Sequence, residues 1–168
     1  RNVRNAKEML LLLAMQSGSR MVYESEEQYA VELNRSVSGT GLPPFEASVQ
    51  FFTNFSNTNS NLYSWNRSQP LDRNAFISGD LAMYFGYGSE VSTIRDLNPN
   101  LNFDVTAMPQ GASATTQRTY GEFYGFAIPK ASKNMQGAFL VANVLTGPEI
   151  APVLTEGLGV APVQRSVI

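Results

Sequence analysis

Residues 72–109 constrain the fold more than any other stretch, because helix and strand signals follow one another there almost without a gap. Asp72 is a good N-cap for a short helix, and Gly79 can take the left-handed conformation that ends one. Residues 81–85 form a short apolar run that predicts a strand, and a glycine-rich turn closes it. This part of the stretch therefore predicts a helix followed by a strand.

The rest of the stretch repeats that order. Ser89 is expected to cap a helix with Glu90 in its first turn, and Pro99 marks its end. Residues 102–107 alternate polar and apolar side chains, which is the period of a strand with one covered face. Helix, strand, helix, strand indicates an α/β fold, and we expect a mixed sheet flanked by helices.

A further helix is predicted near the N-terminus. Asn5, with Glu8 three residues later, approximates a capping box, and Gly18 ends the apolar segment that follows. Residues 9–15 are all apolar, and no charged residue interrupts them. This run is far shorter than the roughly 20 residues that a membrane-spanning helix needs. We therefore expect a helix that is buried in a globular protein.

The next segments predict a helix between two irregular stretches. Residues 19–40 suit a short irregular hairpin or a loop, and Pro43 and Pro44 begin an amphipathic helix that runs to about Ser56. A polar loop with aromatic residues follows at 56–70, and loops of this kind on a rigid scaffold often carry binding groups. The helix residues expected in the core are Phe51, Phe52 and Phe55.

The C-terminal third predicts one strand and two helices. Residues 110–119 are small and polar, which favours a flexible crossing, and residues 120–128 resume as a strand. The helices that follow are expected from Ser132 to Gly147 and from Pro148 to Gly157, with an extended apolar tail after them.

The composition excludes several kinds of chemistry. The 168 residues include no cysteine and no histidine, so disulfides, thiol nucleophiles, Ser-His catalysis and zinc sites built from Cys or His are excluded. Oxygen-ligand metals stay possible, but we expect no cofactor and no metal. With 12 basic and 14 acidic residues, the net charge is −2, and no basic face suggests nucleic acid.

The order of the motifs resembles the extracellular solute-binding proteins of sugar-type, maltose-binding-protein-like ABC importers. The resemblance covers nearly the whole chain and implies a type II periplasmic-binding-protein-like fold with an incomplete second lobe. It rests on Asn5-Ala6-Lys7-Glu8 before the apolar helix and Gly18, on the spacing of Phe76, Gly79 and Ala82-Met83, on Asn98-Pro99, on Met108-Pro109 and on the run from Gly125 to Asn134.

The same resemblance implies a division into lobes. Residues 1–111 would form most of one lobe, 112–118 a crossing segment, 119–157 a strand and helix that return to the other lobe, and 158–168 an extended C-terminal segment. By itself such a chain would expose apolar surface unless it packs back on the first lobe, swaps with a second copy or belongs to a longer chain.

Sugar binding needs flat aromatic platforms and hydrogen-bonding amides or carboxylates, and the chain offers both at predicted element ends. In the resembling family, such places face the cleft between the lobes. The family often has a tryptophan after the strand, where this chain reads Gly86-Tyr87-Gly88-Ser89. The predicted ligand-binding residues are Asn5, Trp65, Asn66, Arg67, Tyr87, Ser89 and Glu122.

Structural roles compete with several of these predictions. Asn5 is an equally good helix cap, and Trp65 could simply cover the phenylalanine-rich helix. Glu122 could form a surface ion pair with Arg118 that stabilises little. Tyr87 lies between two glycines and is hard to explain as core, because glycines permit a close backbone approach.

Nothing in the sequence brings two carboxylates together, so we expect a binding protein and not an enzyme. The resemblance implies capture of a small polar solute, a sugar or an oligosaccharide, outside the membrane, in the periplasm or at the cell surface, with a lipoprotein as one form of the protein. The expected partner is an ABC permease, with membrane contact only through it or through an N-terminal anchor absent from this chain. The alternative is a non-enzymatic protein-interaction domain that uses the aromatic loop at residues 63–67.

Overall fold

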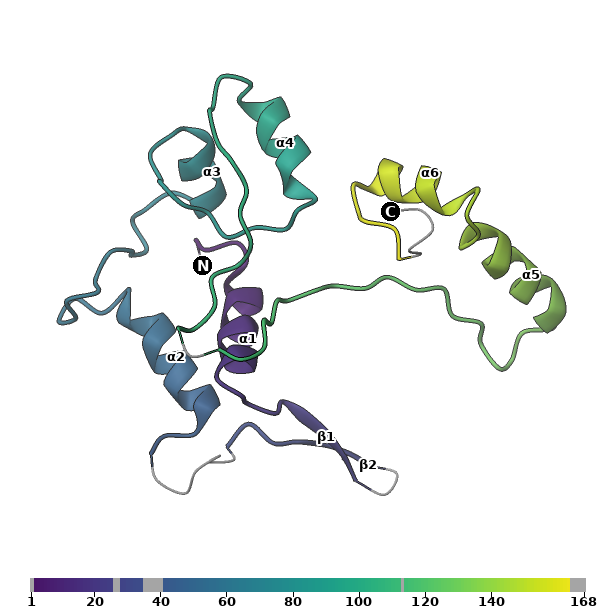
Figure 1. Ribbon diagram of the computed structural model, residues 1–168, viewed down its shortest axis with the longest axis horizontal. Coiled ribbons are helices and arrows are strands. Elements are labelled where there is room, and N and C mark those ends of the chain that lie inside the picture. The colour runs from purple at the N-terminus through teal and green to yellow at the C-terminus, as the bar shows by residue number, and fades with distance from the viewer. Residues whose placement is uncertain (1, 26–27, 35–40, 113, 164–168) are drawn as a thin grey trace. The chain divides into compact units, whose positions relative to one another are not determined.

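The computed structural model describes residues 2–25, 28–34, 41–112 and 114–163, and the regular secondary structure of this part is mostly helical (Figure 1). The elements in chain order are α1 (Ala6–Gln16), β1 (Val22–Ser25), β2 (Gln28–Val31), α2 (Pro44–Asn54), α3 (Asp72–Ile77), α4 (Glu90–Leu97), α5 (Met135–Leu145) and α6 (Ala151–Leu158).

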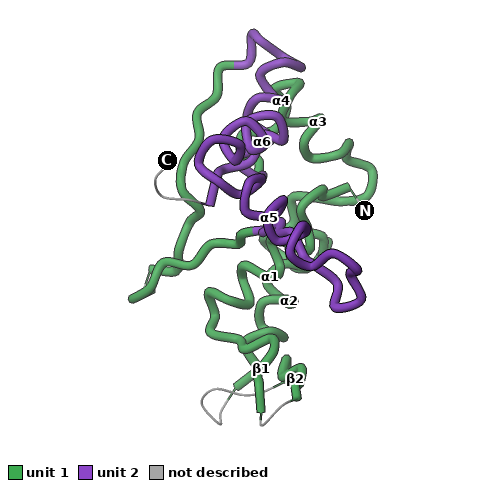
Figure 2. The backbone as a smooth tube through the Cα atoms, turned by 90° about the vertical axis from the view of Figure 1, so that its right-hand side faces the viewer, with its two compact units in different colours: residues 1–85, 102–121 green, residues 86–101, 122–168 purple. Residues whose placement is uncertain are grey.

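The chain divides into two compact units (Figure 2). Unit 1 comprises residues 1–85 and 102–121 and contains α1, β1, β2, α2 and α3. Unit 2 comprises residues 86–101 and 122–168 and contains α4, α5 and α6. The chain thus leaves unit 1 after residue 85, forms α4 in unit 2 and returns to unit 1 at residue 102. The lobe boundaries inferred from the sequence stay a prediction.

The helix pair α1 and α2 forms the centre of unit 1. As expected from its apolar sequence, α1 has buried side chains, Leu12 and Ala14. Two serines join the helices: Ser48 Oγ lies 3.1 Å from Ser17 Oγ and donates to the Pro44 carbonyl at 2.8 Å. Ser48 is itself buried, so these hydrogen bonds satisfy a polar group that burial would otherwise penalise.

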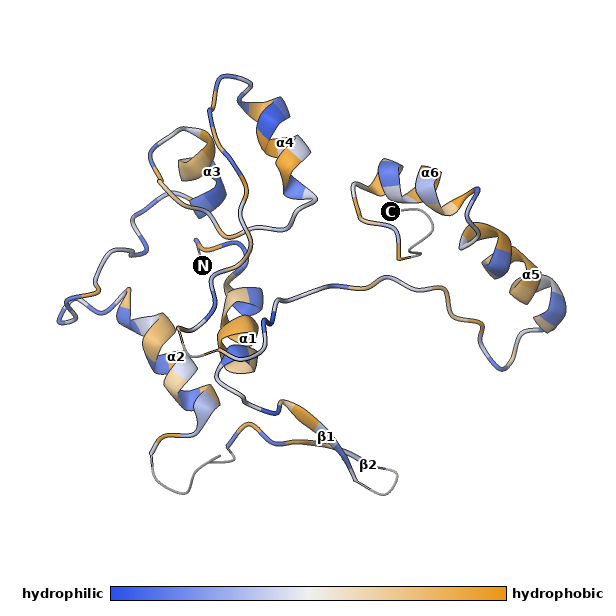
Figure 3. Ribbon diagram, in the orientation of Figure 1, coloured by the Kyte–Doolittle hydropathy of each residue, from blue (hydrophilic) through white to orange (hydrophobic). Residues whose placement is uncertain are grey.

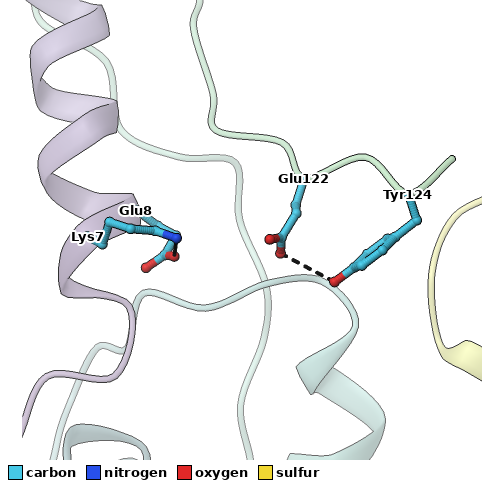
Figure 4. Close-up of polar contacts among 4 residues, drawn as sticks. All are labelled: Lys7, Glu8, Glu122 and Tyr124. Carbon is cyan, nitrogen blue, oxygen red and sulfur yellow. Dashed lines mark hydrogen bonds and ion pairs between the residues drawn. The ribbon is translucent and has the colours of Figure 1, made fainter. Parts of the chain in front are cut away.

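The predicted capping box at the start of α1 is wrong. Asn5 occupies the N-cap position, but its side chain makes no capping hydrogen bond. Glu8 instead pairs with Lys7 at 3.1 Å (Figure 4). A hydrogen bond from its own backbone N–H lowers the pKa of Glu8, and Lys7 lowers that pKa further. The carboxylate is thus held anionic in the first turn, where the helix dipole favours a negative charge.

The N-cap of helix α3 lies one residue earlier than the sequence predicts. Leu71 is the N-cap, and Asp72 is the first helical residue. The Asp72 carboxylate is buried, and it accepts from the backbone N–H of Arg73 at 2.8 Å and from that of Arg4 at 3.0 Å. Gly79 has a φ of +85°, which confirms the left-handed turn expected after this helix.

Three expected strands are absent from the described part of the chain: residues 81–85, 102–107 and 120–128 are all irregular. A strand needs a hydrogen-bonded neighbour, and the ladder between β1 and β2 is the one that the described residues form. Aromatic packing replaces pairing in the first two segments. The ring of Phe76 lies 5.8 Å from the rings of both Tyr84 and Phe103.

The sheet that does form decides between the hairpin and the loop that the sequence left open for residues 19–40. Strands β1 and β2 are antiparallel, with Val22 opposite Val31 and Ser25 opposite Gln28. Nearly all of its side chains are exposed. The expected mixed sheet is therefore replaced, in the residues that can be described, by one two-stranded antiparallel sheet.

In unit 2, α4 runs to Leu97 and ends before Pro99, as predicted. The Ser89 side chain makes no capping hydrogen bond at its start. Instead, Glu90 Oε2 accepts from the backbone N–H of Tyr87, which lies before the helix, at 3.0 Å. A carboxylate accepts such a bond more strongly than a hydroxyl does.

The two C-terminal helices are present, but their boundaries differ from those predicted. Asn134, and not Ser132, caps α5, since its Oδ1 accepts from the Gly137 N–H at 2.9 Å. Helix α6 passes through Gly157 and ends at Gly159, whose φ of +65° is left-handed. Gly157 needs no such conformation, so it continues the helix.

Apolar side chains are exposed on several helices, as the sequence led us to expect. Figure 3 shows where apolar residues occur along these helices. In α5, Phe139, Leu140 and Val144 are each 60% exposed. The prediction that the phenylalanines of α2 are core is wrong for Phe51, which is 46% exposed, while Phe52 and Phe55 are half-buried. Among the described residues, no helix is both long and apolar enough to span a bilayer.

Candidate functional site

A cavity of about 710 Å³ lies in unit 1, and all of its lining residues belong to that unit. Helices α1 and α2 form two of its walls, and irregular segments complete it at residues 64–67, 81–85 and 108–111. Its volume falls within the range of roughly 300–1,000 Å³ that is typical of small-molecule sites.

The helical walls of the cavity are apolar. Helix α1 contributes Met9, Leu12 and Leu13, and α2 with its C-cap residue contributes Phe51, Phe52 and Phe55. The rings of Phe51 and Phe55 meet edge to face, with centroids 5.2 Å apart. The sequence predicted the phenylalanines as core and α1 as a buried helix, and it did not predict that these residues would line a cavity. Their amphipathic spacing gave no signal that would separate the two roles.

Trp65 is positioned at the cavity by its backbone. Its N–H donates to the Phe55 carbonyl at 3.0 Å, which joins the polar loop to the end of α2. The indole Nε1 is buried and has no hydrogen-bond partner in the described part of the chain. A buried donor without an acceptor costs free energy, so this nitrogen is a natural place for a ligand oxygen.

Asn2 and Asn66 hold the loop beside Trp65. Asn2 Nδ2 donates to the carbonyl oxygens of Asn66 at 2.7 Å and Gln69 at 2.9 Å. The Asn66 side chain accepts from the Ser68 N–H at 2.9 Å and donates to the Tyr63 hydroxyl at 2.6 Å. These bonds fix the loop locally, although residues 56–70 contain no helix or strand.

A polar clamp holds the segment at residues 108–111 against the end of α1. Gln16 Nε2 donates to the Pro109 carbonyl at 2.9 Å, and Gln110 Nε2 donates to the Arg118 carbonyl at 2.9 Å. The Arg118 guanidinium donates to the Met15 carbonyl at the C-terminal end of α1, where the helix dipole favours a cation. The clamp was not predicted, because its partners are distant in the sequence.

The predicted ligand-binding residues are distributed over both units. Trp65, Asn66 and Arg67 all line the cavity in unit 1, whereas Asn5 does not. Tyr87, Ser89 and Glu122 belong to unit 2. Within that unit, the Tyr124 hydroxyl donates to Glu122 Oε2 at 3.5 Å (Figure 4).

The charges around the cavity are few. Asp72 and Arg67 are the charged residues among those that line it. The Asp72 carboxylate already accepts backbone hydrogen bonds, so a ligand would compete with the protein for it. Among the described residues, no three acidic side chains are grouped so as to hold a metal ion.

Asn5 has a structural role that can be tested. Only 8% of it is exposed, and its Nδ2 donates to the Tyr84 hydroxyl at 3.1 Å and to the Phe85 carbonyl at 2.9 Å. We expect Asn5→Ala to lower the free energy of unfolding by about 1–2 kcal/mol, because both acceptors lose a buried donor. Chemical denaturation would measure this, with the exposed Asn74→Ala as the control. Equal stability of the two variants would contradict the structural role.

Comparison with known proteins supplies a family. The model of the family described as bacterial extracellular solute-binding protein matches residues 28–152, which is well over half of the chain. Neither the curated proteins nor the solved structures gave a significant match. The family consists of binding proteins that are not enzymes and that work with an ABC permease. Membership of it implies a periplasmic-binding-protein-like fold. The chain therefore belongs to the bacterial extracellular solute-binding protein family.

Proposed function

We propose that this protein captures a sugar or an oligosaccharide outside the cytoplasmic membrane, in the periplasm or at the cell surface, and delivers it to the permease. Family membership supports the binding of a solute, and the identity of that solute as a carbohydrate is the proposed part. The observation that supports it is the cavity of unit 1, which has Trp65, Asn66 and Arg67 among its lining residues.

These three groups have complementary properties. The indole offers a flat face for the C–H surface of a sugar ring, while an amide and a guanidinium offer donors for its hydroxyl oxygens. We further propose Asn5, Tyr87, Ser89 and Glu122 as ligand contacts, for which the sequence remains the support. No covalent step is required, because a ligand that binds one conformation more tightly shifts the population toward it, and the permease can recognise that state.

The proposal predicts a rise in melting temperature with a carbohydrate. A ligand at 100 times its Kd that binds only the folded state stabilises it by about 2.7 kcal/mol. A thermal-shift screen should include mono- and oligosaccharides, amino acids and polyamines at matched concentrations. We expect a shift with a sugar and a smaller shift in Trp65→Ala.

Two results would contradict the proposal. A shift with an amino acid or a polyamine alone would keep solute binding but exclude the carbohydrate. No shift with any solute from a folded chain would favour the protein-interaction role of the loop at residues 63–67.

A further inference from the structure

The cavity of unit 1 is much more apolar than a fully hydroxylated ligand requires. Its helical walls are built from leucine, methionine and phenylalanine, and Met83 and Met108 extend the same character into the irregular segments. A sugar hydroxyl that leaves water needs a replacement hydrogen bond, and without one its burial costs on the order of 1–3 kcal/mol. A bare sugar would therefore find few partners deep in this cavity.

Most of the polar side chains on the cavity wall are already engaged by the protein. Asp72 accepts from Arg4 and Arg73 N–H groups. The Gln16 and Gln110 side chains bind the carbonyls of the clamp. These groups are committed to holding the walls, so they cannot serve a ligand without releasing a segment.

Trp65 differs from those residues. Its indole nitrogen is buried, and the described residues give it no acceptor. Its ring lies in the same lining as the phenylalanines of α2. A ligand with one oxygen acceptor beside an extended apolar surface complements this arrangement. Arg67 and the Asn66 amide, which uses one of its two N–H groups to bind Tyr63, provide a polar edge next to Trp65.

We infer that the cavity of unit 1 binds an amphiphilic glycoside: an alkyl or aryl group lies against the apolar walls, an oxygen accepts from the Trp65 indole N–H, and the sugar lies at the Asn66 and Arg67 edge. The inference rests on the proposed carbohydrate function and adds the chemical class of the substituent. The site would thus select solutes by their apolar group as well as by their sugar.

Trp65 is the chain's single tryptophan, so its fluorescence reports on this site directly. The unmodified 168-residue chain is titrated with methyl, butyl and hexyl β-glucoside below their micellar concentrations, and with hexanol. Each methylene that becomes buried should lower Kd by about fourfold at most. We expect hexyl glucoside to bind at least about tenfold more tightly than methyl glucoside, and hexanol to bind more weakly than hexyl glucoside.

Trp65→Phe tests the hydrogen bond, because phenylalanine keeps a ring and lacks the N–H. Calorimetry should show several-fold weaker binding of hexyl glucoside, with the dependence on alkyl length retained. Tyr29→Phe is the matched control, since Tyr29 is exposed on β2 and does not line the cavity. Its affinity should equal that of the unmodified chain.

Several outcomes would overturn the inference. Equal Kd values for methyl and hexyl glucoside would exclude an alkyl subsite while leaving carbohydrate binding intact. Equal binding of hexanol and hexyl glucoside would indicate a general apolar surface that does not recognise the sugar. If no glycoside binds but the thermal-shift screen finds another sugar, the inference fails and the proposed function stands. If no solute binds at all, both fail.

Discussion

Replacing Asp72 with alanine is expected to lower the free energy of unfolding by about 2–4 kcal/mol, one of the two largest effects that the structure predicts. Asp72 is only 7% exposed, and its carboxylate accepts from the backbone N–H groups of Arg4 and Arg73. The substitution leaves both donors without their acceptor and removes a negative charge from the first turn of α3. It also removes one link between the segment before α1 and α3, while the backbone N–H of residue 72 still donates to the Asn2 carbonyl at 3.0 Å.

Asp104→Ala is the matched control for Asp72→Ala. Asp104 Oδ1 accepts from the N–H of the next residue, Val105, at 2.8 Å, which repeats the local bond between Asp72 and Arg73. Asp104 is exposed. We therefore expect its loss to cost no more than about 0.5 kcal/mol. Urea denaturation of both variants would measure the difference, and similar midpoints would show that the bond to Arg4 contributes little.

Replacing Ala14 with leucine is expected to destabilise the protein by about 1–3 kcal/mol. Ala14 has no exposed surface, and it lies in α1, which packs against α2. The three added carbons of leucine must displace neighbouring atoms or move the helix, because a close-packed interior has no room for them. Helix propensity does not explain the loss, since alanine and leucine are both good helix formers.

The same substitution at Ala47 separates packing from propensity. Ala47 lies within α2 and is exposed, so leucine there meets solvent. We expect Ala47→Leu to change the free energy of unfolding by less than about 0.5 kcal/mol. Thermal and chemical denaturation of the two variants would test this. A stable Ala14→Leu variant would mean that the contact between α1 and α2 can open without loss.

The helices were largely predictable because their signals are local. The proline pair before Phe45 gave the start of α2, and Pro99 gave the limit of α4. The caps were less predictable, since several side chains compete for each helix end. Asn134 provides the capping hydrogen bond that the sequence assigned to Ser132, and the Ser89 side chain makes none at the start of α4.

The candidate site was predictable only in part. A polar loop that contains the single tryptophan indicated binding, and Trp65, Asn66 and Arg67 do line one cavity. The predicted cap at Asn5 failed because its amide reaches Tyr84 and Phe85, about 80 residues away in the chain. No local pattern encodes such a bond.

The sequence by itself determined the helical segments, the excluded chemistries and the order of motifs that indicates the family. Periodicity, prolines and glycines act within a few residues of themselves, so they can be interpreted without coordinates. The tertiary structure decided whether an apolar run pairs as a strand and whether a phenylalanine lies in a core or a cavity. Strand pairing and burial both depend on what lies opposite a residue, and those neighbours come from distant parts of the chain.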